Sequence, residues 1–281
     1  MTNNVPDTVN HGPSNYLYRL WGPYEPVQGR PNTILVHGAS IRLGAGGIIL
    51  PGHIRNLSNN CFCNLGPLLH NELYGGHNIW EFEYADQSFV LPVTNEHVCF
   101  NFGDLTEYGT RLGQAIEIVK RANQNATTNI VAHSMGGLVA RYAAQDGAVN
   151  KIVTLDTGHF GFDMAGFFAA VLQNLPRETW ENERCVEQTA PGSEFLNNLN
   201  TNFHHCRVNL FSLAAGAPLL GIIVVSLESS HLGEVSNDGI KHYNEHCTPY
   251  RSLQNENHLS IIEIYDEYRH PAFDLIRLFL I

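Results

Sequence analysis

Residues 129–139 read NIVAHSMGGLV, and this stretch constrains the fold more than any other part of the chain. The three apolar residues before His133 predict the end of a buried strand, and the segment LVARYAAQ that follows carries apolar residues at helical spacing. Ser134 then lies on an abrupt turn from strand to helix, where a tightly folded backbone needs small neighbours such as Gly136 and Gly137. The pattern therefore predicts a serine hydroxyl that is held clear of the sheet edge as a nucleophile.

Further apolar runs alternate with amphipathic segments, which is the pattern of a parallel sheet flanked by helices. We expect strands at 32–38, 78–84, 129–133, 150–156 and 208–216. The segment 104–124 has apolar residues three and four positions apart and predicts an amphipathic helix. The C-terminal stretch from residue 259 predicts a helix that Pro271 breaks or restarts. A chain of 281 residues is long enough for one large α/β domain, and we expect a single domain over 1–281.

Two stretches interrupt this alternation. Residues 40–77 are rich in Gly, Asn and Leu and predict a long loop that includes at most one helix. Residues 160–204 predict two helical segments interrupted by Pro176 and Pro191. We interpret 160–204 as a lid or cap insertion whose aromatic-rich face covers a pocket, with an ordinary structural helix pair as the alternative.

The letters AHSMG around the serine fit the G-x-S-x-G pattern of a nucleophile elbow, with Ala132 in place of the first glycine. In such a site, two backbone N–H groups bind the oxyanion that forms when the serine attacks a carbonyl carbon. One donor is the residue after the serine, which is Met135 here. The loop LVHGAS predicts the second donor at Ala39, because Gly38 lets the chain turn beside the pocket. His37 is interpreted as a buried histidine that braces this loop.

Six motifs occur in order between residues 32 and 265: ILVHGA, NIVAHSMGGLVARY, KIVTLDTGH, PGSEFLNNLN, VSNDGI and NHLSI. In these motifs the chain resembles the α/β-hydrolase superfamily, and within it the bacterial true lipases. The resemblance implies an α/β-hydrolase fold, with a mostly parallel central sheet flanked by helices. It also implies a catalytic triad in which Ser134 is the nucleophile, Asp238 the acid and His258 the base.

The residues themselves agree with this assignment but leave alternatives. A serine needs a base that takes its proton and a carboxylate that orients the base. His258 follows the last expected strand and precedes a helix; the competing late histidines are His242, His246 and His270. Asp238 lies in an Asn-Asp-Gly turn suited to presenting a carboxylate, whereas Asp156, which ends the strand after the elbow helix, competes with it. His159 is interpreted as structural.

No metal or cofactor is expected. Many of the resembling lipases bind calcium through an aspartate two residues after the catalytic histidine, and this position is Ser260 here, so no calcium site is predicted. Cys61 and Cys63 lie near His70 in the sequence, but no second cysteine pair follows, which argues against zinc.

The composition narrows the partners and the compartment. The net charge of −11 argues against a nucleic-acid partner, because phosphate binding needs a basic face. No apolar run reaches the roughly 18 residues of a membrane-spanning helix. The 15% of charged residues, the scarcity of lysine and the six cysteines favour a secreted mature chain, with a cytosolic protein as the alternative. The pairing of the cysteines and the oligomeric state are left open.

Together these features predict a serine hydrolase that cleaves carboxylic esters through an acyl-enzyme. The resemblance implies acylglycerol substrates, met at a lipid–water interface. A polyesterase or polyhydroxyalkanoate depolymerase would use the same triad, as would an acyltransferase or a thioesterase. A non-catalytic hydrolase fold used only for binding is the alternative outside enzymes, and the complete set of Ser134, Asp238 and His258 argues against it.

Overall fold

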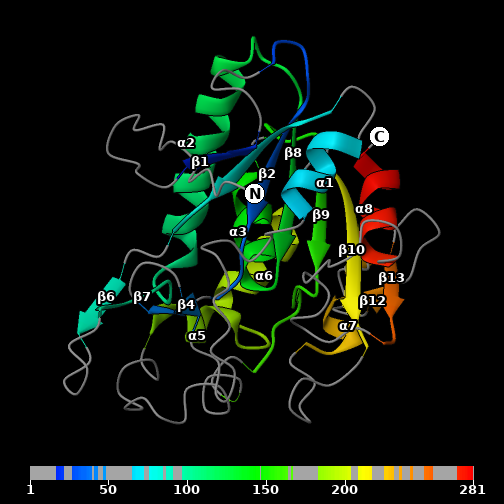
Figure 1. Cartoon of the computed structure of the whole chain (residues 1–281). Helices are drawn as coiled ribbons and strands as arrows, with labels where there is room; N and C mark the ends of the chain where they lie inside the picture. Colours follow the sequence, from blue (N-terminus) through cyan, green and yellow to red (C-terminus); the bar gives the residue numbers. More distant parts are fainter. Residues whose placement is uncertain are drawn as a thin grey trace.

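The computed structural model describes residues 17–21, 27–39, 41–43, 47–48, 65–72, 76–84, 87–90, 97–145, 147–163, 166, 183–203, 208–216, 225–230, 234–235, 241–242, 250–255 and 271–280. Within these ranges the chain forms a central sheet that has helices on both of its faces (Figure 1). This is the layered arrangement that the alternation of apolar and amphipathic segments predicts.

Seven strands form the central sheet in the order β1-β5-β2-β8-β9-β10-β13. Their bounds are β1 Leu17–Trp21, β2 Asn32–Val36, β5 Asn78–Phe82, β8 Thr128–His133, β9 Lys151–Leu155, β10 Asn209–Ala215 and β13 Tyr250–Leu253. Strand β1 runs antiparallel to β5, and every other neighbouring pair is parallel. All five expected strands are present, so the prediction of a mostly parallel sheet is confirmed.

The helices of the described residues have the following bounds: α1 Leu65–Glu72, α2 Leu105–Ala122, α3 Met135–Ala143, α5 Arg184–Thr189, α6 Glu194–Phe203, α7 Leu227–Ser230 and α8 Pro271–Leu280. Helix α2 confirms the expected amphipathic helix, and α8 begins at Pro271, where a break or a restart was expected. The helix expected before this proline, from residue 259, lies outside the described residues. Helices α5 and α6 lie on either side of Pro191, as predicted for the second part of 160–204. None of the helices in the ranges given above is long and apolar enough to cross a membrane.

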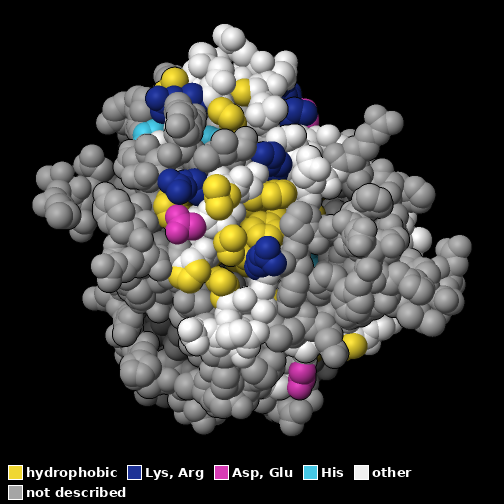
Figure 2. Space-filling view, turned by 90° about the vertical axis from the view of Figure 1, so that its right-hand side faces the viewer, with side chains coloured by type: hydrophobic (Ala, Val, Ile, Leu, Met, Phe, Trp, Pro, Cys, Tyr) yellow, Lys and Arg dark blue, Asp and Glu magenta, His cyan; other side chains and the backbone are white. Residues whose placement is uncertain are grey.

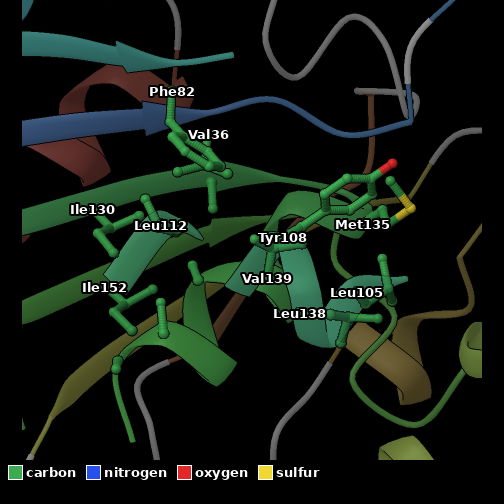
Figure 3. Close-up of a cluster of buried hydrophobic side chains, with 14 of the residues drawn as sticks. Val36, Phe82, Leu105, Tyr108, Leu112, Ile130, Met135, Leu138, Val139 and Ile152 are labelled. Carbon is green, nitrogen blue, oxygen red and sulfur yellow. The ribbon is translucent and has the colours of Figure 1, made fainter. Parts of the chain in front are cut away.

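The inner strands place successive side chains on opposite faces of the sheet, and each face has its own core. Ile130 and Ala132 of β8 pack in a cluster that includes residues of α2 and α3, while Val131 packs in a second cluster with residues of α1 and α8. Figure 3 shows the first cluster, where side chains from the sheet meet those of α2 and α3. The strand that leads to Ser134 is therefore packed on both faces by buried hydrophobic side chains.

Two smaller sheets were not expected. One has the order β4-β3-β7-β6 and the other is the pair β11-β12. Their strands are β3 Ile41–Leu43, β4 Gly47–Ile48, β6 Gln87–Val90, β7 His97–Phe100, β11 Glu234–Val235 and β12 Lys241–His242. The stretch 40–77 thus contributes β3 and β4 as well as the helix α1, whereas a loop with one helix was expected.

Helix α8 is fixed to the sheet by a lysine at the start of β9. The Nζ of Lys151 donates hydrogen bonds to the carbonyls of Phe279 and Leu280, at 2.8 and 3.3 Å. Carbonyls at a helix C-terminus lack intrahelical partners, and a cation there also interacts favourably with the helix dipole. Figure 2 views the molecule from the α8 side, where hydrophobic side chains gather among lysines and arginines. Leu278 of α8 is 66% exposed on the surface.

Candidate active site

Ser134 occupies the turn between β8 and α3 that the sequence predicts. Its backbone has φ 53° and ψ −129°, a combination that costs a residue with a Cβ about 1–3 kcal/mol unless the surroundings enforce it. The surroundings do so through backbone contacts: the N–H of Ser134 donates to the carbonyl of Leu155 at 2.8 Å. The carbonyl of Ser134 accepts from the N–H of Gly137 at 3.0 Å and from the hydroxyl of Thr157 at 2.9 Å.

Three glycines allow the chain to close around Ser134. A Cβ at Gly38 would lie 2.7 Å from the Cβ of Ser134, and one at Gly136 would lie 2.3 Å from the carbonyl oxygen of His37. A Cβ at Gly137 would lie 2.1 Å from the hydroxyl oxygen of Thr157. Real Cβ atoms do not approach other atoms so closely, so each position requires glycine for the packing seen here. Gly38 and Gly136 bring the loop after β2 directly against the serine turn, and Gly137 brings α3 against Thr157 in the loop after β9.

The two residues expected to bind the oxyanion lie beside these glycines, one in the loop after β2 and one at the start of α3. Met135 is the first residue of α3 and is fully buried, and Ala39 follows Gly38 in the loop after β2. Ala39 is partly buried and packs against the larger core cluster. Both residues therefore border the nucleophile turn, one on each side of it.

His37 is buried and its ring contacts the loop that carries Ala39. The ring Nδ1 lies 2.8 Å from the carbonyl oxygen of Gly38, and Nε2 lies 3.1 Å from Oε1 of Glu83. This agrees with the interpretation of His37 as a brace for the loop. Sequence reasoning missed Glu83, although its place just beyond the carboxyl end of β5, which is the neighbour of β2, is a usable signal.

Asp156 places a second carboxylate, besides that of Glu83, at the carboxyl edge of the sheet, directly after the strand next to β8. It follows β9, is 1% exposed and has φ 47°. Its Oδ1 accepts a hydrogen bond from the N–H of Ala215 at 2.9 Å and another from the hydroxyl of Ser230 at 3.4 Å. The carboxylate thus reaches from the end of β9 to the end of β10, which keeps it a candidate for the acid.

His159 belongs to a buried polar network behind the turn. Its Nε2 lies 3.2 Å from the hydroxyl of Thr154 and 3.1 Å from that of Ser212, and its Nδ1 lies 3.3 Å from Nη1 of Arg141. Arg141 is fully buried and donates from Nη2 to Oδ1 of Asn200 at 2.8 Å. These contacts agree with the structural role expected for His159, since they join α3, α6, β9 and β10.

The two other members of the expected triad, Asp238 and His258, lie outside the described residues. Strand β13 ends at Leu253, so His258 follows the last strand of the sheet by five residues. Of the competing histidines, His246 and His270 are also outside the described residues, while His242 belongs to β12. Within the expected lid, 164–165, 167–182 and 204 are outside the described residues.

The comparisons with known proteins match this architecture. Residues 68–168, just over a third of the chain, match the family described as "Putative serine esterase (DUF676)". No curated protein matches the sequence significantly. Phospholipase PlaB from Legionella pneumophila is similar in structure, with a TM-score of 0.57 and 16% identity over 90% of this chain and 59% of that chain. The chain has the α/β-hydrolase fold.

Other solved structures with a similar fold are lipases by name. Lipase BlEst2 from Bacillus licheniformis in its propeptide form has a TM-score of 0.59 and 14% identity over 93% of this chain and 53% of that chain. A lipase-esterase related protein from Clostridium acetobutylicum has a TM-score of 0.53 and 14% identity over 94% of this chain and 98% of that chain. The chain spans between half and two thirds of PlaB and of the BlEst2 propeptide form. The matched family is described by serine esterase activity, and the neighbours share the fold of this chain.

Proposed function

We propose that this α/β hydrolase cleaves carboxylic esters with Ser134 as its nucleophile. The observation that carries the proposal is the backbone of Ser134, which is held at a positive φ of 53° with Gly38 packed against its Cβ. Strained backbone at a serine, enforced by its neighbours, is a feature of nucleophile turns rather than of ordinary packing. The match to a family of serine esterases supports the same chemistry.

In the proposed reaction, the Ser134 hydroxyl attacks the ester carbonyl and gives its proton to His258. Asp238 orients the imidazole and stabilises the imidazolium. The N–H groups of Ala39 and Met135 bind the tetrahedral oxyanion, and each such donor lowers the barrier by about 3 kcal/mol. His258 then protonates the leaving alcohol, which departs and leaves an ester on the serine. His258 then takes a proton from a water molecule, which attacks the ester and forms a second tetrahedral intermediate. Collapse of this intermediate releases the acid, and His258 returns the proton to the oxygen of Ser134.

The proposed substrates are acylglycerols presented at a lipid–water interface. The insertion 160–204 contains the apolar run GFDMAGFFAAVL, which suits contact with long acyl chains and a lid that opens at an interface. The names of the neighbours, which include a phospholipase and a lipase, support a lipid ester as the substrate class.

The test is hydrolysis of p-nitrophenyl esters from acetyl to palmitoyl, run beside emulsified triolein, with Ser134→Ala as the control. We expect long-chain and triolein activity in the wild type and a loss of at least about 10³-fold in kcat in the variant, because the nucleophile is gone. A fluorophosphonate probe should label the wild type and leave the variant unlabelled. Activity on short esters alone would show a carboxylesterase instead of a lipase. Full activity in Ser134→Ala would refute the assignment of Ser134 as the nucleophile.

A further inference from the structure

The carbonyl oxygen of Gly38 has three side-chain donors around it. The amide Nδ2 of Asn101 donates to it at 3.0 Å, and Nδ1 of His37 lies 2.8 Å away. The hydroxyl of Tyr84 is 3.5 Å from the same oxygen and donates more closely to the neighbouring carbonyl of His37. One carbonyl in a short loop thus receives far more support than the usual single hydrogen bond.

That carbonyl belongs to the peptide group whose N–H is that of Ala39. In a trans peptide the C=O and the N–H lie in one plane and point in opposite directions. Donors that fix the Gly38 oxygen on one side therefore fix the direction of the Ala39 N–H on the other. Hydrogen bonds to the carbonyl also polarise the peptide, which strengthens its N–H as a donor.

The same peptide lies against the nucleophile, because a Cβ on Gly38 would come within 2.7 Å of the Cβ of Ser134. The fixed peptide is therefore where an oxyanion formed at Ser134 would need its donor. Asn101 and His37, the two nearest donors to the carbonyl, are themselves 0% and 1% exposed. Buried donors in a dry site hold an orientation better than exposed ones, because water does not compete for the carbonyl.

Aromatic packing and an acidic partner keep these donors in place. The rings of His37 and Tyr84 stack with centroids 4.4 Å apart, and Tyr84 meets Tyr108 of α2 edge-on at 4.9 Å. Nδ1 of His37 lies 2.8 Å from the carbonyl oxygen of Gly38, which can only accept, and Nε2 lies 3.1 Å from Oε1 of Glu83, a second acceptor. The contacts that hold the loop after β2 thus continue through these rings to α2 in the core of the domain.

We infer that Asn101, together with His37, is a positioning residue that aims the Ala39 N–H at the oxyanion of the ester reaction. The inference rests on the proposed ester hydrolysis and adds a residue that neither the elbow motif nor the triad includes. Asn101 acts through the Gly38–Ala39 peptide and does not itself touch the substrate. Its removal should weaken binding of the transition state and leave binding of the ground-state ester nearly unchanged.

The test replaces Asn101 by leucine, which has a similar size and no donor. With p-nitrophenyl butyrate, we expect Asn101→Leu to lower kcat by about 10–100-fold and to change KM by less than about threefold. Phenylboronic acid, which forms a tetrahedral adduct with an active serine, should lose affinity by about the same factor as kcat/KM. The matched control is Asn123→Leu: Asn123 is also fully buried and hydrogen-bonded, but it lies at the amino end of the sheet. Its kcat should stay within about threefold of the wild type.

If Asn101→Leu does not fold, Tyr84→Phe takes its place, because it removes one hydroxyl donor and keeps the stacked ring. It should lower kcat by about 3–10-fold, with a matching loss of boronate affinity. A folded Asn101→Leu protein that keeps its kcat, or one that loses kcat without losing boronate affinity, would overturn the inference. Wild-type protein that neither hydrolyses esters nor is labelled at Ser134 would instead refute the proposed function itself.

Discussion

Buried asparagines cluster at the amino ends of the central strands, whereas a serine and an aspartate occupy the carboxyl ends of β8 and β9. Asn32 and Asn78 begin β2 and β5 and are 0% and 1% exposed, much like Ser134 at 3% and Asp156 at 1%. The asparagine at Asn78 exchanges hydrogen bonds with the backbone N–H and carbonyl of Val27, at 2.9 and 3.1 Å. At this end, buried polar groups hold loops in place.

The carboxyl end differs in backbone strain and in close approach. Ser134 and Asp156 both have positive φ, at 53° and 47°, directly after a strand. Positive φ also occurs at Gln124 and Asn125, but there it belongs to the turn that follows α2, next to the amino ends of the strands. Burial of polar groups alone therefore does not distinguish the edge that carries the proposed nucleophile from the opposite edge of this sheet. The two edges differ in backbone strain at the strand ends and in the presence of glycines where a Cβ would clash with a neighbouring segment.

The largest expected effect concerns the acid. Asp238→Asn should lower kcat by about 10⁴-fold, because the amide no longer holds the base in the correct tautomer. Asp156→Asn keeps an oxygen for the N–H of Ala215 and should change kcat by less than about tenfold. Steady-state hydrolysis of p-nitrophenyl butyrate by both variants decides between the two carboxylates. The reverse pattern would assign the acid to Asp156 and make the strained residue at the end of β9 part of the triad.

The next effect concerns the packing at the carboxyl edge. Gly136→Ala would place a Cβ 2.3 Å from the carbonyl oxygen of His37, and backbone has to move to relieve the clash. We expect a loss of about 3 kcal/mol in the free energy of unfolding, measured by urea denaturation. The matched control is Gly113→Ala in α2, where a Cβ meets nothing within 4 Å and should stabilise the helix by about 0.5–1 kcal/mol. Equal stability of the two variants would mean that the backbone at His37 moves away from a Cβ at position 136 at little cost in free energy.

At the amino end, His77 should make stability depend on pH. Burial, with a smaller contribution from the positive charge of Lys151, lowers the pKa of His77 from 6.5 to about 4. The unfolded chain therefore binds the proton first, so stability is complete above pH 6.5 and is lost as the pH falls from 6.5 to about 4. The loss is at most about 3 kcal/mol.

The measurement is the difference in unfolding free energy between wild type and His77→Gln at pH 7 and pH 4.5. The wild type should lose more stability than the variant, since glutamine stays neutral and can still bond to the hydroxyl of Thr33, which lies 2.6 Å from Nδ1 of His77. Parallel curves for the two proteins would show that folding does not lower the pKa of His77.

The smallest effect probes the strain at Ser134 directly. Its φ and ψ suit glycine, so Ser134→Gly should be more stable than Ser134→Ala by about 1 kcal/mol. The same comparison at Gln114, an exposed position within α2, should have the opposite sign, because glycine in a helix is less stable than alanine by about 1 kcal/mol. Calorimetry on the four variants measures both differences. The same sign at both positions would remove strain as the distinguishing mark of the carboxyl edge.

The inner strands and the elbow were predictable from the sequence, because a parallel strand buried on both faces consists of a run of apolar residues. Strand β13, with the sequence Tyr-Arg-Ser-Leu, was missed, since a strand at the edge of the sheet is only partly buried and carries no such run. Asn101 and Glu83 were missed for a different reason. Their roles depend on β5 lying beside β2 and on a loop folding back to Gly38, and neither relation is written in a local motif.

The backbone contacts of Ser134 also govern when the proposed nucleophile acquires its geometry during synthesis. Its N–H and carbonyl are held by Leu155 and Thr157, which leave the ribosome more than twenty residues later. The glycine against which it packs, at position 38, was made nearly a hundred residues earlier. Such distant pairings form slowly and only after the intervening chain is complete. A nascent or truncated chain that stops before residue 157 carries the serine without these backbone contacts, so the proposed nucleophile gains its geometry only after the later residues are made.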